Sequence, residues 1–232
     1  MSDSSTLPHQ PLSIVEARIL GCLCEKEATT PDYYPLTLNS LIAACNQKSN
    51  RAPVLELDDS AVDAGTESLR AKHLAARVTQ AEARVAKFKH TLDSVYPIPD
   101  PQRAILTELL LRGPQTAGEL RSRCERMHRF ASLDEVREEL GQMASGDFPL
   151  VVELPRQPGK KDARFAHLLS GEPEIASGET AAIGGPLKVE VSTTLPAEAE
   201  ARIATLEQTV ARQAEELAAL RQELAAFRAQ FE

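Results

Sequence analysis

The sequence predicts a mainly α-helical α+β protein with two tandem winged-helix domains and a C-terminal coiled-coil helix. The first observation behind this prediction is an order of three amphipathic helices and two short strands, which occurs twice. The second is a heptad pattern of apolar residues near the end of the chain. The expected divisions are a disordered N-terminus at 1–11, domains at 12–98 and 99–169, a flexible linker at 170–196 and the coiled coil at 197–232.

A capping motif opens the first predicted domain. In Ser13-Ile-Val-Glu16, the hydroxyl and the carboxylate are spaced to bond each other's backbone N–H groups at a helix start. The expected elements are a helix from Ser13 to about Glu27, a helix capped by Thr37 that ends near Cys45, a helix from Asp58-Asp59-Ser60 to Lys72-His73, and hairpin strands at 74–78 and 84–90.

The same order returns in the second predicted domain. Asp100-Pro101 is expected to be an N-cap followed by proline at the first helical position, and Gly113-Pro114 ends that helix. The later elements are a helix from the capping box Thr116-Ala-Gly-Glu119 to about Met127, a helix from the capping box Ser132-Leu-Asp-Glu135 to Met143, and paired strands at 150–154 and 164–169 joined by a loop at 155–163.

Apolar residues repeat every seven positions after Pro196. Ile203, Val210, Leu217, Leu224 and Phe231 occupy heptad position a, and Leu206, Gln213, Leu220 and Phe227 occupy position d. The g and following e positions pair opposite charges, as in Arg202 and Glu207, which is typical of a parallel coiled coil. We expect these apolar side chains to form the interface of a homodimer. A trimer, or a lone amphipathic helix packed on the body, fits the same pattern.

Charge is unevenly distributed along the chain. The 26 basic and 34 acidic residues give a net charge of −8 and a pI of about 5.3, but residues 171–232 hold five basic and 11 acidic residues. The predicted domains are therefore nearly neutral, so the low pI does not exclude nucleic-acid binding. The longest apolar run, Leu41–Cys45, is too short to span a membrane, and the first ten residues lack the features of a secretory signal. We therefore expect a cytoplasmic protein without membrane contact and with reduced thiols.

No motif indicates catalysis, a metal or a cofactor. Cys22 and Cys24 project about 200° apart on a helix, so they cannot hold one metal ion from one face. The five histidines, at positions 9, 73, 90, 128 and 167, show no catalytic or metal-binding spacing. The sequence therefore predicts a non-enzymatic protein.

Basic residues mark a candidate nucleic-acid interface. The predicted contacts are Arg121, Arg123 and Arg126 on the second helix of the second domain, Arg156, Lys160, Lys161 and Arg164 around its hairpin loop, and Lys87 and Lys89 on the first hairpin. In winged-helix proteins the hairpin contacts phosphates while the third helix enters the major groove. Here the third helices begin with acids such as Asp58 and Asp134, which oppose groove insertion and complement the helix dipole. A solvated basic loop is the alternative interpretation of the hairpin.

The segment Asn46-Gln-Lys-Ser-Asn-Arg51 lacks the glycine-rich loop that precedes the Lys-Ser pair of a nucleotide-binding P-loop. Its amide and cationic side chains are expected to bond backbone carbonyls and to lock the turn into the third helix. The same groups could instead contact phosphate or a partner peptide.

Several segments resemble the YceH-like family of bacterial proteins. They are Cys45-Asn-Gln-Lys-Ser-Asn-Arg51-Ala-Pro53, Arg84-Val-Ala-Lys-Phe88, Leu110-Leu-Arg-Gly113, Gly118-Glu-Leu-Arg-Ser-Arg123, Phe165-Ala-His-Leu168 and Ser170-Gly-Glu172, within a match over residues 12–172. The resemblance implies two tandem winged-helix domains in a cytoplasmic protein and supplies no activity. The first hairpin tip, Thr79-Gln-Ala-Glu82, departs from the Gly/Ser-rich composition expected there.

Two functions follow from these observations. The first is a dimeric DNA-binding transcription regulator, in which the coiled coil sets the spacing of two half-sites on double-stranded DNA. The second is a protein-interaction adaptor, in which the acidic third helices and the coiled coil bind protein partners without DNA. The basic hairpin favours the first.

Overall fold

The computed structural model describes residues 10–79, 85–146, 148–156, 159, 161–173, 187–188, 209 and 212–213. Within these residues the chain is a mixed α+β protein with seven α-helices and small, mostly antiparallel sheets. The chain divides after Val189 into two compact units, and the segments predicted as separate domains, 12–98 and 99–169, both belong to the first unit.

The first half of this unit runs in the order helix, strand, helix, helix, strand, strand. These elements are α1 (Ile14–Thr29), β1 (Leu36–Thr37), α2 (Leu38–Cys45), α3 (Asp59–Ala71), β3 (Ala75–Val78) and β4 (Lys87–His90), accompanied by η1 (Pro31–Tyr33), β2 (Leu55–Glu56) and α4 (Leu92–Val95). The strands form an antiparallel sheet in the order β1-β4-β3. The capping box of Ser13 and the caps at Thr37 and Asp58 are confirmed.

The second half repeats this order. Its elements are α5 (Asp100–Arg112), β5 (Gln115–Thr116), α6 (Ala117–Arg123), η2 (Cys124–Arg126), α7 (Leu133–Met143), β6 (Val151–Glu153) and β7 (Arg164–His167). The strands form an antiparallel sheet in the order β5-β7-β6. Both predicted hairpins and the capping box of Thr116 are therefore confirmed.

Three local predictions in the second half were wrong. Pro99, and not Asp100, is the N-cap of α5, because the Asp100 carboxylate pairs with Arg103 one turn further on. The α6 helix ends at Arg123 and continues as the 3₁₀ turn η2. Ser132 caps α7, but the Glu135 carboxylate accepts from the Ala131 N–H at 2.6 Å instead of closing the capping box.

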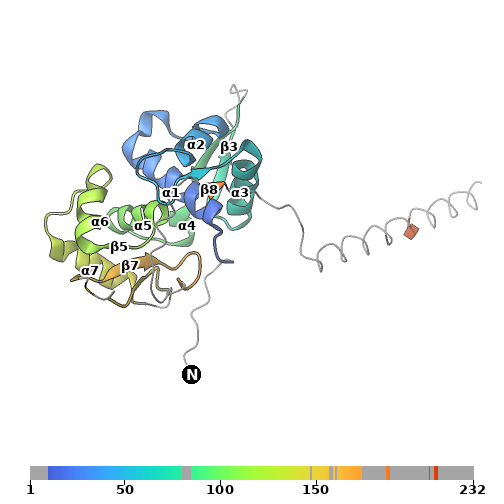
Figure 1. Ribbon diagram of the computed structural model, residues 1–232. Coiled ribbons are helices and arrows are strands. Elements are labelled where there is room, and N and C mark those ends of the chain that lie inside the picture. The colour runs from blue at the N-terminus through green and yellow to red at the C-terminus, as the bar shows by residue number, and fades with distance from the viewer. Residues whose placement is uncertain are drawn as a thin grey trace, which may run out of the picture. The chain divides into compact units, whose positions relative to one another are not determined.

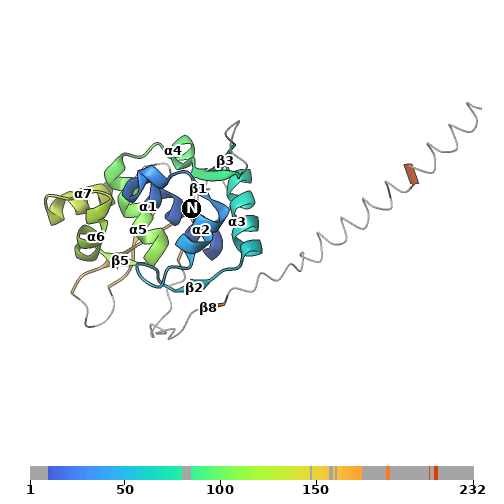
Figure 2. The ribbon, with the colours of Figure 1, turned by 90° about the horizontal axis from the view of Figure 1, so that it is seen from above.

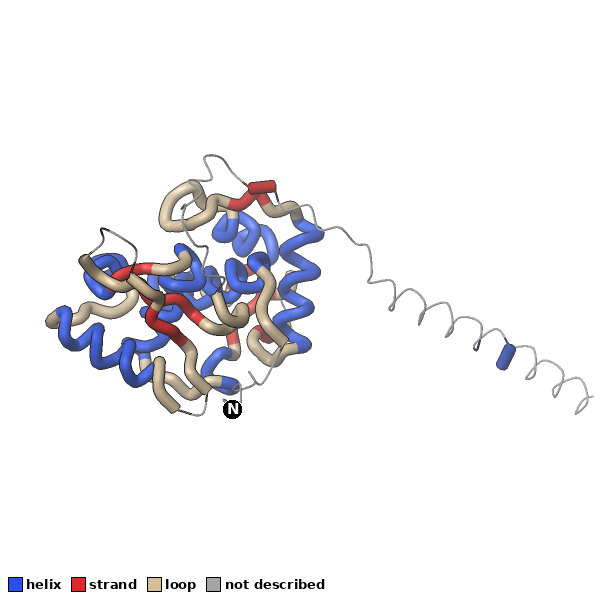
Figure 3. The backbone as a smooth tube through the Cα atoms, turned by 60° about the horizontal axis from the view of Figure 1, so that its bottom comes forward, coloured by secondary structure: helices blue, strands red, loops and turns tan. Residues whose placement is uncertain are grey.

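The helices α1 and α5 lie side by side in the middle of the unit, with α2 and α3 on one side and α6 and α7 on the other (Figures 1 and 2). Gly21 permits this close approach, because a Cβ atom there would lie 2.9 Å from Leu111 Cδ2. Buried apolar side chains of both halves, such as Ile19 and Ile105, belong to one hydrophobic core. The strands are short and lie in separate groups among the helices (Figure 3).

Little of the chain after residue 173 is described. Within the segment 170–196, which was predicted as a flexible linker, Leu187–Lys188 form β8, which pairs in parallel with β2. In the second unit the structure describes Thr209, Arg212 and Gln213, which are helical. The predicted coiled-coil interface residues, Lys160 and the greater part of the predicted N-terminal disorder lie outside the described residues.

Candidate functional site

Two of the predicted phosphate contacts, Arg123 and Arg164, form hydrogen bonds to other residues of the second half. Arg123 donates to Gln115 Oε1 at 2.7 Å and to Glu119 Oε1 at 3.4 Å. Arg164 donates to Pro114 O at 2.9 Å and places its other terminal nitrogen 4.0 Å from Glu119 Oε2. Burial opposes ionisation of Glu119, but the Thr116 N–H and these guanidiniums outweigh it and lower its pKa. Arg123 and Arg164 therefore hold α6 against the sheet.

Other predicted cations face solvent. Arg121, Arg126, Arg156, Lys161 and Lys89 are exposed, and Lys87 is partly buried. Arg156 and Lys161 flank the loop between β6 and β7, and neither forms an ion pair with another residue of the described ranges. Lys87 and Lys89 alternate on β4 with buried side chains, so both face away from the core, but they belong to the other sheet. The predicted interface is therefore divided between two sheets.

A cavity of about 380 Å³ lies between α6, α7 and the β6–β7 hairpin. Its lining residues are Ala117, Gly118, Leu133, Arg137, Leu140, Gly141, Ala144, Glu153, Arg156, Asp162, Ala163 and Phe165. Arg137 is not among the sequence-predicted contacts. It stands one helical turn after Leu133 and one before Gly141, and this spacing places it on the same helix face. The cavity thus combines an apolar lining with two arginines and two carboxylates.

The third helix of each half presents acids to solvent. On α3, Asp59, Asp63 and Glu67 are exposed at intervals of four residues, which places them on one face. On α7, Asp134 and Glu138 are exposed with the same spacing. These carboxylates would face the phosphates of any DNA duplex that received either helix in its groove.

Asn46 acts as a backbone mimic at the start of the loop between α2 and α3. Its Nδ2 donates to Leu57 O at 2.8 Å, and Leu57 N donates to Asn46 Oδ1 at 2.8 Å. Both bonds tie the beginning of the loop to its end. This geometry supports the structural interpretation of the segment.

Two buried arginines hold the same loop from inside. Arg51 donates to Glu25 Oε2 at 2.6 Å and to Glu25 Oε1 at 3.2 Å, and its Nε donates to Ala44 O at 3.1 Å. Arg18 donates to Cys45 O at 3.1 Å and to Pro53 O at 2.6 Å, on either side of the loop. The loop is therefore closed by guanidinium bonds to backbone carbonyls. For Arg51, a bond of this type is what the sequence predicts.

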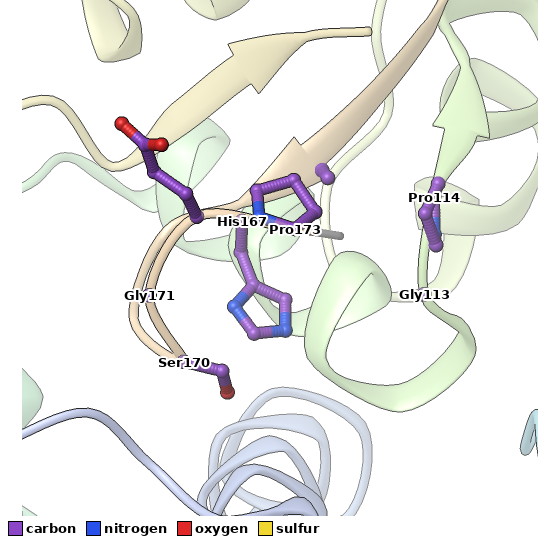
Figure 4. Close-up of a pocket in the computed structure, with 8 residues that line it drawn as sticks. Gly113, Pro114, His167, Ser170, Gly171 and Pro173 are labelled. Carbon is purple, nitrogen blue, oxygen red and sulfur yellow. The ribbon is translucent and has the colours of Figure 1, made fainter. Parts of the chain in front are cut away.

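A second cavity, of about 280 Å³, lies beside β7. The His167 imidazole points into the space between Ser170 and the Gly113 turn (Figure 4). Its Nδ1 atom is buried and has no hydrogen-bond partner in the described part of the chain, and burial lowers the His167 pKa to about 4. The ring is therefore neutral at pH 7. No hydrogen bond joins His167 to Ser170 among the described residues.

The described residues contain no group of three or more His, Cys, Asp or Glu side chains placed to hold a metal ion. None of the helices in those ranges combines the length and the apolar character needed to cross a bilayer.

Comparisons with known proteins agree on one family. The family described as "Protein of unknown function, DUF480" matches residues 12–160. A UPF0502 protein of Geobacter sulfurreducens is 51% identical over 221 residues, covering 95% of this chain and 98% of that protein. UPF0502 proteins of Geotalea uraniireducens and Pelobacter propionicus are 49% and 47% identical, with the same coverage of each chain. The chain therefore belongs to the DUF480/UPF0502 family of uncharacterised bacterial proteins, consistent with the YceH-like resemblance.

Proposed function

We propose that the chain is a non-enzymatic, cytoplasmic, tandem winged-helix protein that binds double-stranded DNA through phosphate contacts, as a dimer joined by its C-terminal coiled coil. The winged-helix assignment is supported by the repeated order of elements, in which a third helix is followed directly by a two-stranded hairpin. A protein with this arrangement can contact phosphates through the hairpin without inserting a helix.

The observation that carries the proposal is the pair of exposed cations, Arg156 and Lys161, on either side of the second hairpin loop. Neither is neutralised by an ion pair within the described ranges. Because α3 and α7 expose carboxylates, we expect binding to depend on phosphates and not on base contacts. Each neutralised phosphate contributes about −0.9 to the slope of log affinity against log salt.

Removing these two cations is expected to weaken DNA binding. The variant Arg156→Ala/Lys161→Ala should bind a random duplex roughly tenfold more weakly at low salt, and its salt slope should be less steep by about 2. Fluorescence anisotropy of a labelled duplex across a salt series measures both quantities on the full chain.

The matched control is Lys48→Ala/Arg70→Ala, which removes the same charge from solvent-accessible positions of the first half. This control should keep the wild-type slope. An equal loss in both variants would show that only net charge matters. Baseline anisotropy for the wild type at every salt concentration would refute DNA binding.

A second candidate function is a protein adaptor, and the carboxylate row of α3 favours it. Asp59, Asp63 and Glu67 would bind a partner that presents a basic helix or strand. This adaptor would show no DNA affinity in the anisotropy experiment. Replacement of the three acids by Asn or Gln would reduce binding of a basic partner if the chain is an adaptor. The same replacement would not reduce DNA binding if the chain binds DNA.

A further inference from the structure

The cavity between α6, α7 and the β6–β7 hairpin has an apolar floor. Leu140 is 1% exposed and belongs to the hydrophobic core, and Leu133 and Phe165 pack against that core while they also line the cavity. Leu133, Leu140 and Gly141 recur at helical spacing, so one face of α7 forms a wall. The cavity volume of about 380 Å³ falls within the range of roughly 300–1,000 Å³ that is usual for small-molecule sites.

Two arginines and two carboxylates form the rim of this cavity. Arg137 comes from α7, Glu153 from β6, and Arg156 and Asp162 from the loop between β6 and β7. All four residues are exposed. Glu153 stands directly opposite Phe165 in the hairpin register, which places both side chains on the same face of the hairpin. An apolar floor is therefore combined with a charged, solvent-facing rim.

The opposite charges of the rim do not neutralise each other. Among the described residues, no ion pair joins an arginine of the rim to a carboxylate of the rim. Arg137 pairs at 3.1 Å with Asp134, which does not line the cavity, and the two side chains are 54% and 88% exposed. A surface pair of this kind is weak and easily exchanged. Both signs of charge therefore remain available to a bound molecule.

We propose that this cavity binds an apolar α-amino acid as its zwitterion. The α-carboxylate accepts hydrogen bonds from the guanidinium groups of Arg156 and Arg137, because the planar fork of arginine matches a carboxylate. The α-ammonium group donates to the carboxylates of Glu153 and Asp162. The side chain packs on the apolar floor, where its removal from water is favourable.

Other classes of small molecule match the rim less well. A simple carboxylic acid or a phosphate would bring its negative charge to Glu153 and Asp162. A simple amine would bring its positive charge to the two arginines. A polar molecule without an apolar part would leave the floor in contact with water. The zwitterion with an apolar side chain satisfies the floor and both charges of the rim.

Calorimetric titration of the full chain with L-leucine and with L-phenylalanine tests this assignment, and at least one of them should bind saturably. Two analogues each remove one charge from L-leucine, since 4-methylpentanoate lacks the ammonium group and 3-methylbutylamine lacks the carboxylate. Each analogue should bind about tenfold more weakly or worse, because a hydrogen bond between charged groups is lost. Glycine keeps both charges but lacks the side chain, and it should also bind more weakly.

Variants locate the bound molecule. A Cβ atom at Gly141 would meet nothing within 4 Å, so Gly141→Leu places a larger side chain in free space of the cavity and should abolish binding. Arg156→Gln should weaken L-leucine binding about tenfold. Glu153→Gln should reduce the preference for L-leucine over 4-methylpentanoate. Arg126→Gln changes an exposed arginine outside the cavity lining and is the matched control, which should bind like the wild type.

These titrations contain no DNA, so their outcome does not depend on the proposed DNA binding, although Arg156 takes part in both proposals. The analogue series uses the wild type and therefore remains decisive if a variant fails to fold. The proposal would be overturned if neither amino acid bound saturably at millimolar concentrations or if 4-methylpentanoate bound as tightly as L-leucine. Wild-type affinity in Gly141→Leu would also overturn it.

Discussion

Replacing Arg51 with Met is expected to lower the free energy of unfolding by about 3–5 kcal/mol. The Arg51 side chain is fully buried, and its partner Glu25 is only 10% exposed. Methionine fills much of the space of the arginine stem but leaves the Glu25 carboxylate buried without its bidentate partner. The loop also loses the bond from Arg51 to Ala44 O. Chemical denaturation followed by circular dichroism measures the loss.

Two further variants distinguish a buried charge from a lost contact. Glu25→Leu/Arg51→Met removes both charges and should be more stable than Arg51→Met alone, because the Glu25 carboxylate is then no longer buried without its arginine partner. Arg70→Met breaks the exposed pair with Glu67, and we expect a change of at most about 1 kcal/mol. If Arg51→Met unfolds at the wild-type denaturant concentration, the pair does not stabilise the fold.

The same measurement at lower pH has an expected sign. Burial opposes ionisation of Glu25, but Arg51 and Lys26 outweigh it, so the folded-state pKa lies below the ordinary carboxyl value. A lowered folded pKa contributes stability that is fully present above the unfolded value and is lost as the pH falls through the folded one. In Arg51→Met, the part of the acid-dependent loss of stability that comes from the Arg51–Glu25 pair should disappear.

The helix starts could be predicted because the residues that make them are neighbours in the sequence. Ser13 bonds the backbone of Glu16, and a spacing of three residues is visible in any sequence. The two-residue strands β1 and β5 carry no periodicity, so the third strand of each sheet could not be predicted. The shared core of the two halves depends on contacts between α1 and α5, which no local pattern reports.

The candidate site was predicted less completely because a sequence shows charges without their partners. The sequence predicts Arg123 and Arg164 as phosphate contacts, but in the folded chain both form ion pairs with Glu119. Arg137 was not predicted, because its neighbours on α7 are acidic, although the fold places it with Arg156 in the lining of one cavity.

Replacing Gly21 with Ala is expected to lower the free energy of unfolding by about 1–3 kcal/mol, despite the higher helix propensity of alanine. The new Cβ would lie 2.9 Å from Leu111 Cδ2, 3.0 Å from Leu111 Cγ and 3.1 Å from Leu110 Cβ. The Leu110 Cβ atom is fixed by the α5 backbone and cannot turn aside. The two central helices must therefore move apart, and equilibrium denaturation measures the resulting loss.

Gly141 on α7 is the matched control, because a Cβ atom there would meet nothing within 4 Å. Gly141→Ala should therefore raise the free energy of unfolding by about 0.5–1 kcal/mol through helix propensity alone. Opposite signs at the two glycines would show that Gly21 serves the contact between α1 and α5. Stabilisation by both substitutions would contradict the tight packing of the two halves. Because that contact joins their cores, its loosening should destabilise both halves together.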